Sequence, residues 1–256
     1  MYLDKYKICI CMCITENIKN YAQYSEKINN QYAIKHGYDF KVFDYTMTDR
    51  APQWCKILVV NTLLESNYYD YLFWIDADAY FNKQEITLES IIKTDINKNI
   101  IICKDIVNNS SKYSVALNTG TFFVKTTEWS KNFFKLMWNY KGEYLYKPYH
   151  EQTIMEQFLD EDIMDVKNNI SIKESTLFNS EINELNSDSI NDRFIIHLMA
   201  QNKTTRINNM SYWPKYKPFI IRTLENYIIG NYIHLWLLVI IIIIIIVYIS
   251  KITYRK

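Results

Sequence analysis

Glycine is scarce in this chain of 256 residues, which contains only Gly37, Gly120, Gly142 and Gly230. These four are too widely spaced to form a GxGxxG dinucleotide loop or a Walker A loop, because both need clustered glycines where the backbone approaches phosphate. A pyrophosphate bound without such a loop is usually held by a metal ion and basic side chains. We therefore expect any nucleotide site in this chain to use those groups.

Net charge is also nearly absent, since 29 Lys and Arg side chains balance 28 Asp and Glu side chains and leave a formal charge of +1. This balance argues against nucleic acid as a partner held by bulk charge. Hydrophobic residues make up 49% of the chain and aromatic residues 16%, so a sizeable core is expected and disorder is not.

The cysteine count is five, and an odd number argues against a disulfide framework. Cys9, Cys11 and Cys13 alternate along a segment typical of a buried strand, so they share one face and are expected to pack as small apolar groups. The alternative is that these three thiols bind a soft metal, but three thiols along one strand make poor tetrahedral geometry. Free thiols favour a reducing compartment.

Strand and helix patterns alternate along most of the chain and predict one α/β domain with a mostly parallel sheet over residues 1–220. Gly37 lies where the first helix should end, since a terminal residue with positive φ is commonly glycine. The polar, Asn-rich segments are expected to be loops. The predicted strands are 7–14, 39–43, 71–75, 100–103, 121–124 and 193–198, the helices 18–36, 52–66, 129–140 and 151–158, and the loops 167–192 and 199–216.

A long apolar run, residues 232–249, stands near the end of the sequence. As a helix it would be about 27 Å long, close to the thickness of a bilayer core. We expect a transmembrane helix at 228–250 and a short basic tail at 251–256, with a buried core helix or strand as the alternative. The first residues do not resemble a signal peptide. The expected localisation is therefore a single-pass C-terminal membrane anchor with residues 1–220 in the cytosol.

The strongest chemical signal is FWIDADAYF, residues 73–81, in which two carboxylates follow an apolar strand. In an extended conformation Asp76 and Asp78 would point the same way and converge on one hard cation. Ligands of open α/β sheets bind near such strand ends. A surface turn rich in aspartate is the alternative, but apolar residues flank the pair on both sides.

Further motifs stand before and after the pair in one order along the chain, and together they resemble glycosyltransferase family 34, the retaining galactosyl-, mannosyl- and xylosyltransferases. The resemblance covers roughly residues 7–206 and implies a single GT-A (Rossmann-like) domain with a DXD motif. It also implies transfer of a hexose or pentose from a UDP- or GDP-sugar to a glycan, protein or lipid acceptor. The motifs are YAIKHGY (32–38), WCK (54–56), WIDADA (74–79), LNTGTFF (117–123), EWS (128–130), Glu151-Gln152 and His197.

A metal site is the first consequence of this resemblance. Asp78 is expected to bind Mn²⁺ (or Mg²⁺) directly, and Asp76 to contact both the ribose and the metal shell. His197, on a late predicted strand, matches the family's third ligand. Without the matched order it would be interpreted as a core histidine. Mn²⁺ accepts mixed carboxylate and imidazole ligands, so the set is chemically sound.

Donor-binding residues are expected around this metal. Lys56, Lys203 and Arg206 would help neutralise the diphosphate, although solvated surface charge is the alternative for each. Thr15 and Asn17 follow the first strand, where the base and ribose lie in such folds. Gly120 would let the backbone pass close to the sugar.

Three residues are expected to act on the transferred sugar. Asn118 would hydrogen-bond its hydroxyls, unless residues 117–120 form only a turn. Glu151 and Gln152 would stabilise an oxocarbenium-like state of the sugar. Retention of configuration could then proceed by front-face return of the acceptor or through a covalent sugar on a carboxylate. His150 departs from the family pattern, which has an acid there.

Two other functions remain open at this point. A metal-dependent phosphohydrolase could use the same aspartates, but two-metal hydrolases usually recruit more acidic and histidine ligands. A non-catalytic, membrane-anchored interaction module could keep the fold. Loss of catalysis should then have broken the DXD motif or removed the late histidine, and both are intact.

Overall fold

The computed structural model describes residues 6–45, 49–105, 113–146, 148, 150–182, 190, 192–211 and 213. The chain divides into two compact units, Met1–Met210 and Ser211–Lys256. In the second unit only residues 211 and 213 are described, so the account below concerns the first. The predicted transmembrane helix at 228–250 and the basic tail at 251–256 lie outside the described residues. Within the described ranges, no helix is both long and apolar enough to cross a membrane.

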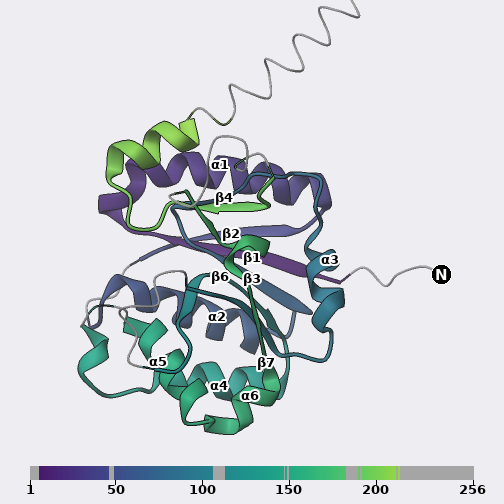
Figure 1. Ribbon diagram of the computed structural model, residues 1–256, viewed down its shortest axis with the longest axis vertical. Coiled ribbons are helices and arrows are strands. Elements are labelled where there is room, and N and C mark those ends of the chain that lie inside the picture. Colours follow the sequence, from purple (N-terminus) through teal and green to yellow (C-terminus); the bar gives the residue numbers. More distant parts are fainter. Residues whose placement is uncertain are drawn as a thin grey trace, which may run out of the picture. The chain divides into compact units, whose positions relative to one another are not determined.

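A six-stranded sheet forms the centre of the first unit (Figure 1). Its strands run in the order β2 (Asp39–Asp44), β1 (Ile8–Ile14), β3 (Tyr71–Ile75), β6 (Leu117–Lys125), β5 (Ile100–Lys104) and β7 (Ile170–Lys173). β1 pairs in parallel with β2 and β3, and β5 pairs in parallel with β7. β6 runs antiparallel to both of its neighbours, β3 and β5. The sheet is therefore mixed but mostly parallel, which confirms the predicted class.

Helices cover both faces of this sheet. On one face lies α1 (Lys19–His36), and on the other α2 (Cys55–Glu65), α4 (Glu128–Trp138) and α5 (His150–Asp160) lie together (Figure 1). Gly37 ends α1 with φ of 73°, the left-handed conformation that the sequence predicted there. The shorter helices are η1 (Glu16–Ile18), η2 (Pro52–Trp54), α3 (Leu88–Ile92), η3 (Lys93–Asp95), η4 (Glu143–Leu145), η5 (Ile163–Asp165), α6 (Val166–Asn169) and α7 (Ser175–Phe178).

The central strands are buried because helices cover the sheet on both sides. Every residue of β3 is buried, and so is every residue of β6 before Lys125. β3 is accordingly a continuous apolar run, whereas β6 carries polar residues in its first half. Polar residues that follow β3 or lie within β6 are therefore held next to the core, where an unpaired charge is costly.

A second, three-stranded sheet joins distant parts of the chain. It consists of β4 (Ala79–Phe81), β9 (Ile195–His197) and β8 (Ser180–Glu181), with β9 in the middle. β4 and β9 are antiparallel, and their register places His197 opposite Ala79. The Leu198 amide also donates to the Asp78 carbonyl oxygen at 2.9 Å. This pairing brings a late histidine beside the DXD aspartates.

The cysteine prediction was correct for packing and wrong for oxidation state. Cys9 and Cys11 are fully buried on one face of β1 and pack in the main core, as expected. Cys13, however, forms a disulfide with Cys55 across 42 residues of sequence. Cys103 remains a buried thiol. The Cys13–Cys55 bond depends on β1 meeting the start of α2 in space, and the number of cysteines in the sequence does not reveal such a contact. With this disulfide present, the cysteines no longer favour a reducing compartment.

The two predicted loops were also wrong in part. Residues 167–192 contain most of α6 together with β7, α7 and β8, and residues 203–210 are helical. The strand predicted at 121–124 begins earlier, at Leu117, so residues 117–120 are part of β6 and not a turn. These elements are short or polar, and they form because other strands pair with them, so they leave little periodic pattern in the sequence.

Candidate metal and donor site

The DXD residues lie at the carboxyl end of β3, where a buried strand leaves the sheet. They are not in an extended segment, as the sequence predicted, but in a turn in which the Ala79 amide donates to the Asp76 carbonyl oxygen at 2.9 Å. The turn ends β3 and leads into β4, which pairs with β9 in the second sheet. Asp76 is held on two sides, since its amide donates to the Gly120 carbonyl at 2.8 Å and its Oδ1 accepts from Trp74 Nε1 at 2.7 Å.

Asp76, Asp78 and His197 form the predicted triad. One potential ligand atom from each lies within 4.8 Å of the other two. His197 Nε2 is 3.2 Å from Asp78 Oδ1, and His197 Nδ1 is 2.9 Å from Asn179 Oδ1. If Nδ1–H donates to Asn179, the lone pair of Nε2 faces the carboxylates, which is the usual arrangement of a metal-binding imidazole. The donor set of two carboxylates and one imidazole fits a divalent ion such as Mn²⁺.

Gly120 leaves the space that His197 needs. A Cβ atom at this position would lie 2.1 Å from His197 Cε1 and 2.6 Å from Nδ1. Asn118, two residues earlier on β6, accepts from the Gly120 amide at 2.9 Å and donates to Met199 Sδ at 3.2 Å. Gly120 and Asn118 therefore both lie near the triad, as predicted, and both contact other residues of the protein.

Charge couples Asp78 to two cationic partners. Burial by itself disfavours its ionised form, but His197 and the Arg206 guanidinium, whose Nη2 is 2.7 Å away, together lower the pKa of Asp78 to about 2. Burial likewise disfavours the imidazolium, yet the Asp78 carboxylate outweighs burial and raises the pKa of His197. The residue predicted to contact the donor phosphates, Arg206, therefore pairs with a predicted metal ligand.

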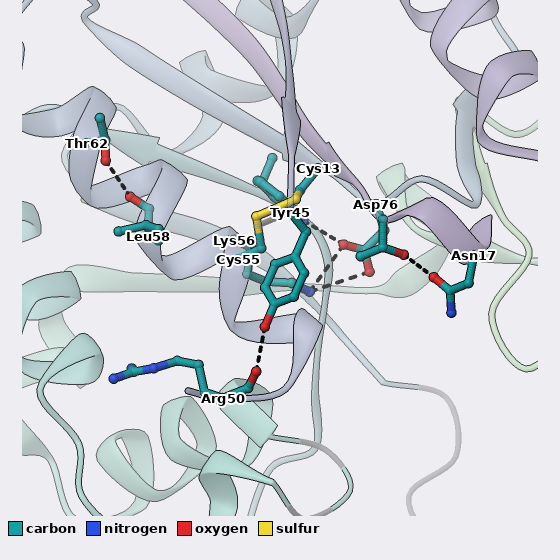
Figure 2. Close-up of a disulfide and its surroundings, with 11 residues drawn as sticks. Cys13, Asn17, Tyr45, Arg50, Cys55, Lys56, Leu58, Thr62 and Asp76 are labelled. Carbon is teal, nitrogen blue, oxygen red and sulfur yellow. Dashed lines mark hydrogen bonds and ion pairs between the residues drawn. A yellow bond between two sulfur atoms is a disulfide. The ribbon is translucent and has the colours of Figure 1, made fainter. Parts of the chain in front are cut away.

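Lys56 connects the DXD motif with α5. Its buried Nζ lies 3.2 Å from Asp76 Oδ1, 3.0 Å from Glu151 Oε1 and 3.0 Å from the Thr119 carbonyl oxygen. Figure 2 shows this side chain reaching from α2 toward Asp76. Burial opposes the charge, but the two carboxylates outweigh it and raise the pKa of Lys56. Lys56 is thus an ammonium enclosed between two acids.

Glu151 and Gln152 lie at the start of α5 and face the same strand, β6. Thr119 Oγ1 donates to Glu151 Oε1 at 3.0 Å, and the Thr119 amide donates to Gln152 Oε1 at 3.2 Å. Glu151 is 2% exposed, and its second oxygen, Oε2, has no hydrogen-bond partner within the described residues. A buried carboxylate oxygen without a partner is costly, so this atom is suited to meet a ligand.

A cavity of about 310 Å³ opens beside these groups. Thr15, Asn17, Lys56, Asp76 and Asp78 are among its lining residues, together with Arg206. Thr15 and Asn17 hydrogen-bond to each other at one part of its wall. Lys203 is exposed and is not one of the residues described as lining the cavity. The structure therefore gathers most of the predicted donor-binding residues around one space.

Several residues at this site were missed by the sequence analysis. Thr119 contacts Lys56, Glu151 and Gln152, and Asn179 orients His197. Trp74 is buried, lines the cavity and donates to Asp76. The position of Trp74 two residues before Asp76 could have indicated that it contacts this aspartate. No sequence signal indicates the role of Asn179, because it reaches the site only through the pairing of β8 with β9.

The ion pair between His197 and Asp78 predicts a pH dependence of stability when metal is removed by EDTA. The folded-state pKa of His197 is raised above the ordinary value of 6.5, so the imidazolium stabilises the fold fully below that pH and loses this effect as pH rises through the raised pKa. The loss in free energy of unfolding caused by His197→Gln should therefore be larger at pH 6 than at pH 9. Each unit of pKa shift corresponds to about 1.4 kcal/mol.

Urea unfolding at both pH values, with EDTA throughout, measures this difference. In an Asp78→Asn background the same histidine substitution should show little change with pH, because the partner charge is gone. An equal effect of His197→Gln at pH 6 and pH 9 in the otherwise unchanged protein would contradict the pairing.

The enclosed Lys56 predicts a large loss of stability on Lys56→Met. Removing one partner of a buried ion pair leaves uncompensated charge, here on Asp76 and Glu151, and typically costs about 3 kcal/mol or more. Adding Glu151→Gln should recover part of that loss, because one of the two stranded charges is removed. Urea unfolding gives the free energies of the three proteins.

Lys104→Met is the matched control. Its ammonium lies 2.7 Å from Glu174 Oε1, but both side chains are largely exposed. Such surface pairs contribute at most about 1 kcal/mol. A loss for Lys56→Met no larger than that for Lys104→Met would show that Lys56 is not an essential counter-ion.

Comparison with known proteins identifies the family. The family model described as nucleotide-diphospho-sugar transferase matches residues 21–223, which is most of the chain. No curated protein matches the chain.

Solved structures show the same fold. A glycosyltransferase involved in glycosylation of the major capsid of PBCV-1 aligns with a TM-score of 0.64 and 17% identity, covering 80% of this chain and 98% of its own. The galactosyltransferase LgtC, in complex with donor and acceptor sugar analogs, aligns with a TM-score of 0.52 and 12% identity over 80% of this chain and 94% of its own. The bifunctional glycosyltransferase WbbM aligns with a TM-score of 0.51 and 12% identity, covering 85% of this chain and 52% of its own.

These neighbours share the GT-A-like arrangement, a mixed α/β fold with a mostly parallel central sheet. The family match covers the residues of the triad, the enclosed lysine and the part of the cavity lining from Tyr21 onward. The chain therefore belongs to the nucleotide-diphospho-sugar transferase family and is a nucleotide-sugar-dependent glycosyltransferase.

Proposed function

We propose that the protein is a metal-dependent, retaining glycosyltransferase that binds a UDP- or GDP-sugar in the cavity beside Asp76, Asp78 and His197. The observation that carries the proposal is the position of Asp76 and Asp78 on the cavity wall, with His197 completing the triad behind them. The base and ribose would bind near Thr15 and Asn17, and the diphosphate near the triad.

The charges of the site explain why a divalent ion is needed. Three carboxylates, on Asp76, Asp78 and Glu151, face two cationic side chains, Lys56 and Arg206. His197 would bind a cation in its neutral form, and in that form three negative and two positive charges leave a net charge of −1, which repels a diphosphate. One divalent ion would reverse the sign to +1. When bound, the ion would stabilise the negative charge that develops on the diphosphate as the sugar leaves.

The protein's own residues would orient the donor. Arg206 pairs with Asp78. Its guanidinium would become available for the diphosphate if a cation took its place at that carboxylate. Lys56 keeps Asp76 and Glu151 at a fixed separation, and Lys203, on the exposed side of its helix, would contact phosphate only after that segment moves.

Glu151 and Gln152 would face the transferred sugar. The unpartnered Glu151 Oε2 is suited to stabilise positive charge at the anomeric carbon, or to form a covalent glycosyl intermediate. Asn118 would contact sugar hydroxyls by giving up its contact with Met199. Both routes retain anomeric configuration, in line with the resemblance to glycosyltransferase family 34, which we keep as the finer assignment.

The acceptor would be a glycan, a protein or a lipid. The PBCV-1 neighbour is involved in glycosylation of a capsid protein, and LgtC is a galactosyltransferase. These make a protein acceptor and UDP-galactose useful first choices for assays. No described feature favours the phosphohydrolase or the non-catalytic module over transfer, and the family membership favours transfer.

We further propose the domain limits and membrane attachment expected from the sequence. The transferase domain would occupy residues 1–220, a C-terminal helix at 228–250 would anchor it, and the basic tail at 251–256 would follow. The domain would then face the cytosol. The apolar run at 232–249 is the support for this arrangement.

Release of nucleoside diphosphate tests the proposed activity. The full chain, kept in mild non-ionic detergent because of the apolar run, is incubated with a panel of UDP- and GDP-sugars and either Mn²⁺ or EDTA. We expect release with one donor in Mn²⁺ and none in EDTA. Asp78→Asn should lower kcat/KM at least about 100-fold, because an ion ligand is lost.

Asp192→Asn is the matched control, since this exposed aspartate pairs only at the surface with Lys83 and should leave turnover unchanged. Metal-independent release, or equal turnover by Asp78→Asn and Asp192→Asn, would refute the proposed metal role. Folded protein that neither binds nor hydrolyses any donor in the panel would refute the proposed donor site. The anomeric configuration of the product, read by NMR, tests retention.

A further inference from the structure

The Cys13–Cys55 disulfide joins two walls of the donor cavity. Cys13 lies near the end of β1 and Cys55 is the first residue of α2, and their Cα atoms are 6.6 Å apart. Both residues line the cavity of about 310 Å³. Figure 2 shows the bond between these two elements with Lys56 and Asp76 beside it. A covalent link therefore connects the proposed base-binding end of the cavity with the ionic cluster.

Residues next to each half-cystine belong to the proposed donor site. Thr15 follows Cys13 by two residues, and Lys56 directly follows Cys55. The Lys56 ammonium must stay within about 3 Å of both Asp76 and Glu151, since an enclosed charge has no solvent to replace them. The position of the first turn of α2 is therefore critical for this cluster.

The start of α2 is held by the disulfide together with the contacts of Trp54 and Lys56. Neither η2 nor α2 has a side-chain hydrogen bond that caps its N-terminus. The disulfide supplies a covalent restraint at the residue where the helix begins.

The other thiols do not compete for this bond. Cys9, Cys11 and Cys103 are buried, and burial raises the pKa of Cys9 and of Cys103 to about 12 and that of Cys11 well above its ordinary value. Because the thiolate is the reactive form, these three are poor partners for thiol–disulfide exchange. Cys13 and Cys55 are the pair that a reductant can address in the described part of the chain.

We propose that Cys13 and Cys55 are positioning residues for the donor, and that their disulfide makes donor affinity depend on redox state. This inference rests on the proposed donor site. A dithiol reductant gives two electrons, the Cys13–Cys55 bond breaks to two thiols, and the reductant becomes a disulfide. The start of α2 then loses its covalent restraint, Lys56 and Thr15 sample more positions, and ordering them again opposes donor binding.

Linkage gives this proposal a second, independent consequence. If the oxidised protein binds nucleotide more tightly by some factor, bound nucleotide must disfavour reduction of the disulfide by the same factor. For a two-electron couple, a tenfold factor corresponds to a potential lowered by about 30 mV. A disulfide that merely stabilised the fold, without positioning the site, would not respond to nucleotide.

The experiment uses the full chain in mild detergent, with UDP and GDP as probes, each with Mn²⁺. Free thiols are counted after denaturation, with three expected in the oxidised protein and all five after reduction. The dissociation constant is measured for oxidised protein, for protein reduced with a dithiol and desalted, and for protein then reoxidised. We expect roughly tenfold weaker binding on reduction, as loss of preorganisation predicts, and recovery on reoxidation. The donor KM should rise with reduction while kcat changes little.

Variants separate positioning from general stability. Cys13→Ser/Cys55→Ser should bind as weakly as reduced protein and should not respond to reductant. Cys103→Ala is the matched control, because it removes a buried thiol outside the cavity and should keep the full redox response. A redox titration with and without UDP and Mn²⁺ then measures the predicted shift of potential.

Three outcomes would overturn the inference. Five free thiols in protein never exposed to reductant would show that the bond does not form. Equal nucleotide affinity in the oxidised and reduced proteins would refute positioning while leaving the donor site intact. No binding of UDP or GDP in either redox state would refute the proposed donor site itself, and this inference with it.

Discussion

Concentrated negative charge at the carboxyl end of β3 is the constraint on which the rest of this unit depends. Asp76, Asp78 and Glu151 meet there inside an apolar framework, and like charges so close together repel strongly in a medium of low dielectric. The fold meets this constraint with cations from separate segments. Lys56 comes from α2, and Arg206 comes from the helical residues 203–210. The charges thus determine which helices must reach this point.

Strand β6 sets the distances between the two halves of the site. It lies between β3 and β5 and runs antiparallel to both, so its first residues lie beside the DXD turn. Thr119 contacts Lys56 and the two residues at the start of α5, and Gly120 leaves room for His197. One buried strand therefore separates the candidate metal ligands from Glu151, the acid proposed to face the sugar. A side chain added at position 120 would displace His197 directly.

Much of this arrangement could be predicted from sequence where the signal is local. An apolar strand followed by two aspartates marked the end of β3, and Gly37 marked the end of α1. His197 was predicted only through the order of motifs along the chain. Its position depends on β4 pairing with β9, which joins segments more than a hundred residues apart.

The failures share one physical cause, which is dependence on contacts between distant segments. The turn at Asp76 stands where an extended segment was predicted, because the chain passes there from the central sheet into β4, which pairs with β9 in the second sheet. Strand β7 exists because β5 offers it an open edge, although its own sequence resembles a loop. The Cys13–Cys55 bond forms where β1 and α2 meet, and an odd cysteine count carries no information about such proximity. Patterns in sequence report faces and ends of elements, but they do not report which elements become neighbours.

The motif Trp54-Cys55-Lys56 shows how three consecutive residues restrain one helix start in three directions. Trp54 is fully buried and its Nε1 donates to the Tyr144 carbonyl oxygen at 3.1 Å, toward η4. Cys55 is bonded to β1, and Lys56 is paired with Asp76 and Glu151. Because successive residues of a helix point about 100° apart, neighbouring positions necessarily reach different partners. A hydrogen bond, a covalent bond and an ion pair therefore act on the same turn, so the stability of this corner and the geometry of the donor cavity are not separable.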